Sequence, residues 1–261
     1  RKRANQQIRD QRDELERLNK QKAKFFSIVA HDLRGPFGTL LTYLELLSRN
    51  LRETDPEKLE SYVANADRAG RQVYALLENL LEWSWLQMEE VETVQECVPL
   101  KPLLEQSFEL FSPNARNKQV DLQMDSNLDG LKVFGDSRAV DSVLRNLISN
   151  AIKFTSSGGR VEISARADGD QVEITVRDSG VGMKPEARDR LFHADEKTST
   201  PGTAGELGSG LGLLLCKELV EKNGGSIHVE SRPGEGSVFR TRFPICETDT
   251  CEGPPVTIPR K

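Results

Sequence analysis

The sequence predicts two parts of different fold class, a helical hairpin followed by an α+β sandwich. Three observations carry this prediction. Apolar residues recur at helical spacing between residues 57 and 92. Residues 136–154 form a second, strongly amphipathic helical pattern. Pairs of alternating segments later in the chain indicate β-hairpins, and helices mixed with hairpins in this order favour helices on one face of a mostly antiparallel sheet.

The first 50 residues predict one long helix. Ile8, Leu15 and Leu18 fit a coiled-coil seam with charged residues between them, and we assign residues 1–24 to a coiled coil. Pro36 should kink the helix, because its ring removes a backbone donor and clashes with the preceding turn.

A turn is expected at residues 50–56, where Asp55 suits the N-cap and Pro56 the first position of a second helix. That helix is expected over residues 57–92. One hairpin cannot bury so wide an apolar stripe alone, so we expect a symmetric dimer that forms a four-helix bundle. Residues 25–95 are assigned to this dimerising domain.

The α+β part is expected to begin near Pro99 and Pro102, and we assign it residues 96–246. Helices are predicted over residues 100–117, 136–154 and 210–223. Strands are predicted over residues 120–124, 160–167, 171–178, 227–231 and 238–243. The proline-rich residues 247–261 favour a disordered tail or linker.

Composition argues against several classes of protein. A net charge of −5 leaves no basic surplus for nucleic acid. No apolar run approaches the ~20 residues of a membrane span, and no signal peptide is recognisable, so we expect a cytoplasmic protein.

The chain begins at Arg1 without methionine, and we expect a missing upstream part through which a membrane could be reached. The four cysteines, Cys97, Cys216, Cys246 and Cys251, form no CxxC pair and show no zinc-site spacing. We therefore expect all four to be free thiols, buried or in the tail, in a reducing compartment.

One histidine stands in a distinctive setting. His31 lies in the stretch FFSIVAHDLRGPF, residues 25–37, directly before Asp32 and the expected kink. Imidazole can accept a phosphoryl group near neutral pH and release it again. An ordinary surface histidine is the competing interpretation. His193 and His228 have no comparable surroundings, and we interpret both as structural.

An asparagine cluster occupies the amphipathic helix. In the sequence NLISNAIKFT, residues 146–155, Asn146, Asn150 and Lys153 share one helix face because their offsets are four and three. An amide oxygen can ligate Mg²⁺, and a lysine one turn further can meet a phosphate. Taken alone, asparagines on a helix are more often exposed or capping.

Asp178 begins a first glycine cluster at the end of a predicted strand. Its carboxylate can accept a hydrogen bond from the amino group of adenine, and Gly180 and Gly182 let the backbone approach the base. The same pattern alone also suits a simple turn. The later turn at residues 233–239 favours a hairpin, with Ser237 a candidate neighbour of the adenine.

A second glycine cluster opens a helix with Gly208, Gly210, Leu211 and Gly212. Free N–H groups at such a helix start suit phosphates. The cluster matches neither a P-loop nor a dinucleotide fingerprint. The preceding residues 193–207 are rich in small polar residues and favour a mobile, lid-like loop or a disordered surface loop.

In combination these motifs resemble the sensor histidine kinases of two-component systems. The stretch from His31 to Arg34 with Pro36 is similar to their H-box, and residues 146–155 to their N-box. Asp178 to Gly182 resembles the first glycine box, Leu191-Phe192 the F-box, and Gly208 to Leu213 the second glycine box. The resemblance covers roughly residues 20–245, and five boxes in this order are highly specific.

The resemblance implies a dimerisation and histidine phosphotransfer domain, then an ATP-binding sandwich of the Bergerat (GHKL) type. It implies autophosphorylation of His31 with help from Asp32, and transfer to an aspartate of a response-regulator receiver. Mg²⁺ would be held by Asn150, and phosphate contacts would come from Lys153. Asp178 would recognise adenine. The remaining nucleotide-site residues would be Asn146, Phe154, Gly180, Gly182, Gly208, Gly210, Leu211 and Gly212.

The chain departs from the family pattern at Gly35, four positions after the histidine, where Thr or Asn is common and helps place a water. Phosphatase activity towards the partner is therefore in doubt. Two alternatives from other classes are an ATP-driven conformational machine without phosphotransfer and a non-catalytic dimer that relays signals. The first predicts a catalytic glutamate in residues 146–155, which offer Asn, Ser and Lys instead; the second predicts a decayed nucleotide site.

Overall fold

The computed structural model describes residues 12, 30, 33–49, 55–87, 95–125, 127–192, 200–206 and 212–246. Its contacts divide the chain into two compact units, with the division between Ser84 and Trp85. Among the described residues, no helix combines the length and the apolar character that crossing a membrane requires.

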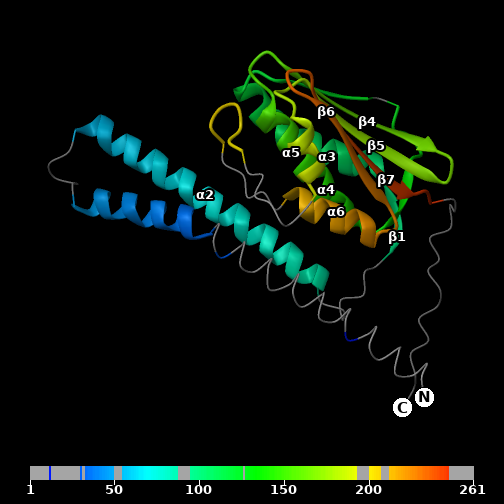
Figure 1. Cartoon of the computed structure of the whole chain (residues 1–261), viewed down its shortest axis with the longest axis horizontal. Coiled ribbons are helices and arrows are strands. Elements are labelled where there is room, and N and C mark those ends of the chain that lie inside the picture. The colour runs from blue at the N-terminus through cyan, green and yellow to red at the C-terminus, as the bar shows by residue number, and fades with distance from the viewer. Residues whose placement is uncertain are drawn as a thin grey trace. The chain divides into compact units, whose positions relative to one another are not determined.

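The described part of the first unit consists of a helix over residues 33–49 and of α2, Pro56–Gln87, whose last three residues fall beyond the division (Figure 1). Asp55 caps α2 as predicted: its Oδ1 accepts a hydrogen bond from the N–H of Glu57 at 3.2 Å. The rings of Tyr43 and Tyr62 join the two helices, with centroids 5.9 Å apart. The first helix continues through Pro36. The kink expected at Pro36 is not tested, because His31 and Asp32, which precede the described start of this helix, lie outside the described residues. The coiled coil expected over residues 1–24 also lies outside them, apart from residue 12.

The second unit contains a five-stranded sheet in the order β2-β4-β5-β7-β6. All neighbours pair antiparallel except β2 and β4, which are parallel. The predicted mostly antiparallel sheet is therefore confirmed, with strand bounds within two residues of those expected from the sequence. The strands are β2 Asp121–Met124, β4 Arg160–Asp168, β5 Gln171–Asp178, β6 Ser226–Arg232 and β7 Gly236–Pro244.

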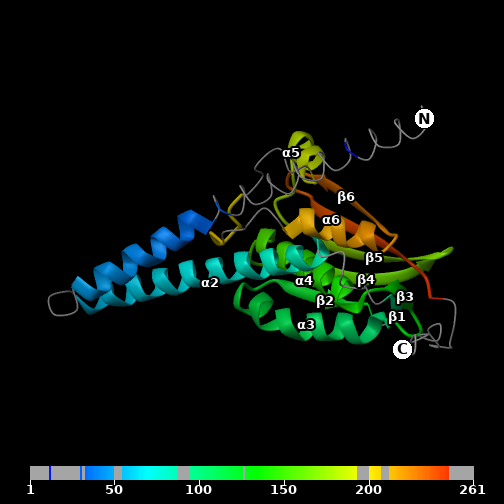
Figure 2. The ribbon, with the colours of Figure 1, turned by 90° about the horizontal axis from the view of Figure 1, so that it is seen from below.

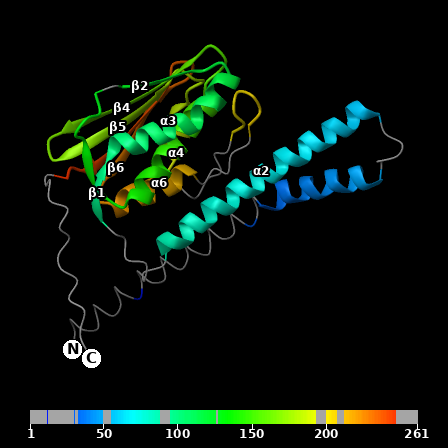
Figure 3. The same cartoon turned by 180° about the vertical axis from the view of Figure 1, so that it is seen from behind.

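Three helices cover one face of this sheet, α3 Leu100–Asn117, α4 Ser137–Phe154 and α6 Gly212–Lys222 (Figures 1 and 2). Helix α4 lies between α3 and α6 (Figure 3). Its apolar stripe meets the alternate residues of β5 that point inward, because strand side chains face opposite sides in turn. The fully buried residues of this core include Val140, Leu144, Leu147, Val172, Ile174 and Val176.

Three short elements do not emerge from the sequence. Strands β1, Glu96–Pro99, and β3, Lys132–Gly135, form a separate two-stranded antiparallel sheet. Helix α5, Pro185–Arg190, is six residues long and has no buried residue. Four-residue strands are too short to show alternation. Pro99, which we expected to mark the domain boundary, is the last residue of β1 instead.

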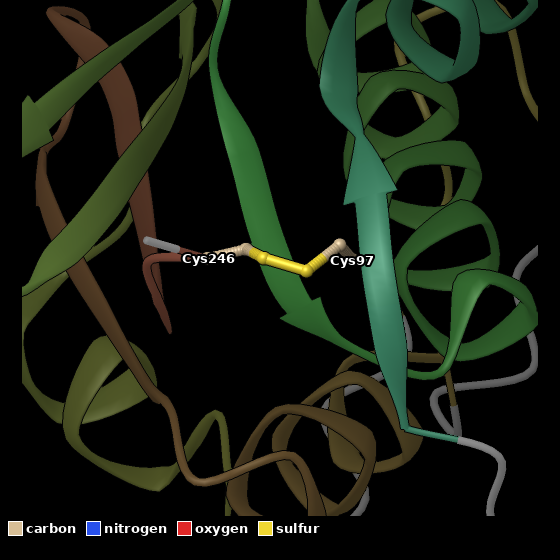
Figure 4. The surroundings of a disulfide bond; sticks show 2 residues. All are labelled: Cys97 and Cys246. Carbon is tan, nitrogen blue, oxygen red and sulfur yellow. A yellow bond between two sulfur atoms is a disulfide. The ribbon is translucent and has the colours of Figure 1, made fainter. Parts of the chain in front are cut away.

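The small sheet brings together two distant cysteines. Cys97 and Cys246 are 149 residues apart and form a disulfide, with Cα atoms 5.6 Å apart (Figure 4). Strand β3 aligns them: Cys97 is paired with Phe134, and the N–H of Cys246 donates to the carbonyl of Lys132 at 3.0 Å. The prediction of thiols at both positions is therefore wrong. Cys216 is buried and outside any disulfide, as expected, and Cys251 lies outside the described residues.

Candidate functional site

Helix α4 supplies the asparagine face predicted from the sequence. The Asn146 side-chain amide donates to the Ser142 carbonyl at 3.1 Å. Its Oδ1 lies against Gly212 at the start of α6, where an added Cβ would overlap that oxygen. A side chain at 212 would therefore displace the Asn146 amide from its present position. The structure brings together one residue of the N-box and the last glycine of the second glycine box.

Asp178 lies at the end of β5 and is 4% exposed. Its Oδ1 accepts hydrogen bonds from the N–H groups of Gly180 at 2.9 Å and of Ser237 at 3.2 Å. Burial raises the pKa of Asp178, although these hydrogen bonds and one with the Ser237 side chain oppose the rise. A carboxylate has about four acceptor sites, so two backbone bonds leave capacity for an amino group.

The loop after Asp178 is packed between α4 and the β6–β7 hairpin. An added Cβ at Gly180 would overlap the carbonyl of Phe154, which also accepts from the N–H of Val181 at 3.1 Å. Gly182 has a φ of +64°, and a Cβ there would overlap the carbonyl of Arg232. The glycines of this cluster therefore fix its position against two other elements, which a free turn would not require.

Lys153 lies in the last turn of α4 and is half-buried. Its Nζ is 4.7 Å from the centroid of the Phe154 ring. Burial lowers the pKa of Lys153, nearby Glu206 opposes that shift, and Lys118 adds to it. Asn150 precedes it by one turn on the same face and is partly exposed. Both residues thus lie on one face of α4, as the sequence predicts.

Sequence reasoning missed Lys118, Thr203 and Glu206. The Lys118 ammonium contacts the end of α4 and the carboxylate of Glu206 at 2.6 Å. The residues 200–206, expected within a mobile loop, are held against α4 through these contacts. Lys118 precedes a strand and Glu206 lies in a glycine-rich stretch. No sequence pattern indicates that these two residues form an ion pair.

A cavity of about 770 Å³ lies on the opposite, outer face of the sheet. It reaches Asp178 and Ser179 but none of the α4 residues, and its walls mix both signs of charge, for example Arg177 and Glu230. We do not place the nucleotide there, because the acceptor and cation face of α4 lies on the helix side.

The residues that could hold Mg²⁺ do not form a carboxylate cluster in the part of the chain that the structure describes. Among the described residues, no group of three or more His, Cys, Asp or Glu side chains could hold a metal ion. Mg²⁺ keeps several waters and takes one or two protein ligands besides phosphate oxygens, so the single amide of Asn150 fits such a role. The predicted site residues His31, Asp32, Gly208, Gly210 and Leu211 lie outside the described residues, as does His193.

Two family models match the chain in succession. Residues 21–89 match the His Kinase A (phospho-acceptor) domain. Residues 135–247 match the histidine kinase-, DNA gyrase B- and HSP90-like ATPase. The order is the one expected from the motifs, and the second match spans every described candidate site residue predicted from the sequence.

Individual relatives agree with these matches. The cell-division control histidine kinase PdhS of Brucella suis is 30% identical over 254 residues, which is 93% of this chain and 24% of that protein. The sensor histidine kinase AruS of Pseudomonas aeruginosa is 35% identical over 242 residues, 89% of this chain and 23% of that protein. The chain thus spans about a quarter of the length of these relatives.

Among solved structures, histidine kinase ThkA in complex with response regulator protein TrrA superposes with a TM-score of 0.67 at 25% identity, covering 89% of this chain and 63% of that one. A helical phospho-acceptor region followed by an ATPase sandwich is thus common to the sequence motifs, the fold and the relatives. The chain belongs to the sensor histidine kinases.

Proposed function

We propose that this chain binds Mg·ATP, transfers the γ-phosphoryl group to its own His31 and then passes it to an aspartate of a response-regulator receiver. The observation that carries the proposal is Asp178, a buried carboxylate in a glycine loop that packs on the end of the Asn150–Lys153 face. The match of residues 21–89 to a phospho-acceptor domain supports the choice of His31 as the acceptor.

Each site residue has one role in this proposal. Asp178 accepts a hydrogen bond from the adenine amino group, and Lys153 contacts the phosphates. Asn150 would hold Mg²⁺, which neutralises phosphate charge when bound. A neutral ring nitrogen of His31 attacks the γ-phosphorus, the bond to the bridging oxygen of ADP breaks, and a phosphoramidate forms. Asp32 orients the ring and takes its proton.

The remaining nucleotide-site assignments rest on the family boxes. We propose that Asn146 and Phe154 line the site from α4, and that Gly180 and Gly182 shape its adenine end. We propose that the backbone of Gly208, Gly210, Leu211 and Gly212 meets the phosphates, as a glycine-rich helix start can.

The dimer expected from the sequence is supported by apolar side chains that the first unit leaves exposed. In both helices they recur three or four residues apart, which places them on one face. These residues are Phe37, Leu41, Leu44, Tyr74, Leu77 and Leu81. A second copy would cover this face in a four-helix bundle. Sedimentation of the full chain should give the mass of a dimer, whereas a stable monomer at micromolar concentration would contradict it.

The domain bounds and the partner follow from the same proposal. We assign phosphotransfer to residues 25–95, catalysis to residues 96–246, and a signalling coiled coil to residues 1–24. ThkA is seen with a response regulator, and a receiver is the partner proposed here. Gly35 lacks the side chain that would place a water, so phosphatase activity is not part of the proposal.

The use of ATP supports a cytoplasmic location, where the Cys97–Cys246 disulfide would be exposed to cellular reductants.

Labelling with γ-phosphate-labelled ATP tests the proposal. Label is expected on the protein, stable in base and lost in acid, as a phosphoramidate requires. The His31→Gln variant should lose all label, because glutamine cannot form that bond. His228→Gln is the matched control, since His228 lies exposed on β6, and it should keep the label. Label that persists in His31→Gln would contradict the proposal. ATP hydrolysis unaffected by that change would favour a conformational ATPase.

A further inference from the structure

The Lys118 ammonium group hydrogen-bonds to carbonyl oxygens at the C-terminal end of α4. It is the C-cap residue of α3, and its side chain is 13% exposed. Its Nζ lies 2.9 Å from the carbonyl oxygen of Ile152 and 2.6 Å from that of Lys153. The last carbonyls of a helix have no partner within the helix and carry its negative dipole end, so a buried ammonium group there is favourable.

The third contact of Lys118 reaches residues 200–206. Glu206 Oε1 accepts from Lys118 Nζ at 2.6 Å, and its Oε2 accepts from the N–H of Ala204 at 2.8 Å. The backbone carbonyl of Glu206 accepts from the N–H of Gly202 at 2.7 Å. All three ammonium donors and both carboxylate oxygens are thus engaged. The segment is held in a closed turn by the same carboxylate that binds Lys118.

Thr203 hydrogen-bonds this turn directly to the backbone of Lys153. Its N–H donates to the Lys153 carbonyl at 3.1 Å, and its hydroxyl lies 2.8 Å from the Thr155 carbonyl. Gly202 packs against the Lys153 side chain, because a Cβ there would lie 2.6 Å from Lys153 Cγ. The backbone of Lys153 is therefore fixed by Lys118 and Thr203, and its aliphatic stem is packed by Gly202.

The geometry points to Lys118 and Glu206 as positioning residues for nucleotide binding: together they fix residues 200–206 to the end of α4 and so determine where Lys153 presents its ammonium group. This inference rests on the proposed function, in which Lys153 contacts phosphates. The ligand groups concerned are the phosphates of the nucleotide, and the adenosine part is read elsewhere, by Asp178.

Calorimetry on the full chain with Mg·ATP and with adenosine tests the inference. Glu206→Gln keeps the side-chain shape but removes the charge that binds Lys118. We expect its affinity for Mg·ATP to fall about 10-fold or more, and its affinity for adenosine to stay within about twofold. Lys118→Met should behave alike, and Lys118→Arg should recover part of the loss because it keeps the charge. A purely structural role would weaken both ligands equally.

Lys101→Met is the matched control. Lys101 is also on α3, and its Nζ lies 2.7 Å from Asp129 Oδ1, but this pair is solvent-exposed and does not touch α4. Its removal should leave both affinities unchanged, because an exposed ion pair contributes little and this one does not hold residues 200–206 or Lys153.

The pH dependence of Mg·ATP binding gives a second readout. The charged groups that face Lys153 are Glu206 from the 200–206 segment and Lys118 from α3. ATP binding should weaken when Lys153 loses its proton as the pH rises. Removing the Glu206 charge lowers the pKa of Lys153 further, so this weakening should begin at a lower pH than in the unchanged protein. Removing the Lys118 charge should move that decline to higher pH.

Two results would overturn the inference: Mg·ATP affinity of Glu206→Gln equal to that of the unchanged protein, or an equal loss for ATP and adenosine. If Lys118→Met does not fold, Glu206→Gln carries the test alone. A chain that binds no Mg·ATP before any substitution would contradict the proposed function itself, which is a separate outcome.

Discussion

Asp178→Asn is expected to reduce ATP affinity by about 100-fold or more, because it replaces the acceptor that we propose for the adenine amino group by a donor. Asparagine can keep the hydrogen bonds that Asp178 Oδ1 accepts from Gly180 and Ser237. The loop should therefore hold its shape, and the loss should come from the base contact alone. Calorimetry with ATP and ADP measures it.

Stability should not fall with this substitution. The pKa of Asp178 is raised in the folded protein. A carboxyl group with a raised folded pKa binds its proton more tightly in the folded than in the unfolded state, so its contribution to stability falls as pH rises from the unfolded value through the folded one. Burial disfavours the charged form of Asp178 in the folded protein, so the uncharged Asp178→Asn should melt no lower than the unchanged protein.

The choice of base gives the matched control for Asp178→Asn. Guanine has a carbonyl oxygen where adenine has its amino group. The variant should therefore lose preference for ATP over GTP, since the asparagine amide can donate to that oxygen. A folded Asp178→Asn protein with unchanged ATP affinity and unchanged base preference would remove Asp178 from the adenine site.

Gly182→Ala is expected to destabilise the second unit by about 3 kcal/mol and to remove measurable ATP binding. A side chain at φ +64° costs about 1–2 kcal/mol. The added Cβ would also overlap the Arg232 carbonyl, and overpacking of this kind adds about 1–3 kcal/mol because backbone must move. Chemical denaturation measures the stability, and titration with ATP measures the site.

Gly169→Ala separates these two costs. Gly169 lies in the β4–β5 turn with the same φ of +64°, and no atom lies within 4 Å of the position of its Cβ. It should show only the backbone cost and bind ATP normally. Equal destabilisation of Gly169→Ala and Gly182→Ala, with ATP binding retained in both, would show that the close approach to Arg232 has no role in the site.

The sequence predicts the parts of this fold that repeat a local pattern. Helix α4 and the strands β4, β5 and β7 follow from periodicity, because each contributes one buried face to a common core. Strand β6 follows from the alternation of half-buried and exposed residues along most of its length. The cap of α2 follows from Asp55 and Pro56, whose preferences act within a single turn.

What the sequence cannot predict depends on contacts between distant residues. Cys97 and Cys246 meet only because both adjoin β3, which is itself too short to show a pattern. Lys118 and Glu206 are 88 residues apart and meet at the end of α4. Spacing identifies pairs within one element, whereas these pairs require the packed arrangement.

The candidate site divides in the same way. Asn146, Asn150, Lys153 and Asp178 can be chosen as candidates from the sequence, because their residue types suit nucleotide chemistry at motif spacing. The need for individual glycines cannot be predicted in this way. Gly182 lies close to a carbonyl of β6, and Gly212 lies close to Asn146. Both contacts join segments that are distant in the sequence.

Tandem mass spectrometry of the protein after incubation with Mg·ATP tests the central claim most directly. Trypsin cleaves after Lys24 and Arg34, which releases residues 25–34 with one histidine. Kept at alkaline pH to preserve a phosphoramidate, this peptide should carry one phosphoryl group, located on His31. A phosphoryl group on any other residue, or none on a protein that binds ATP, would contradict the account.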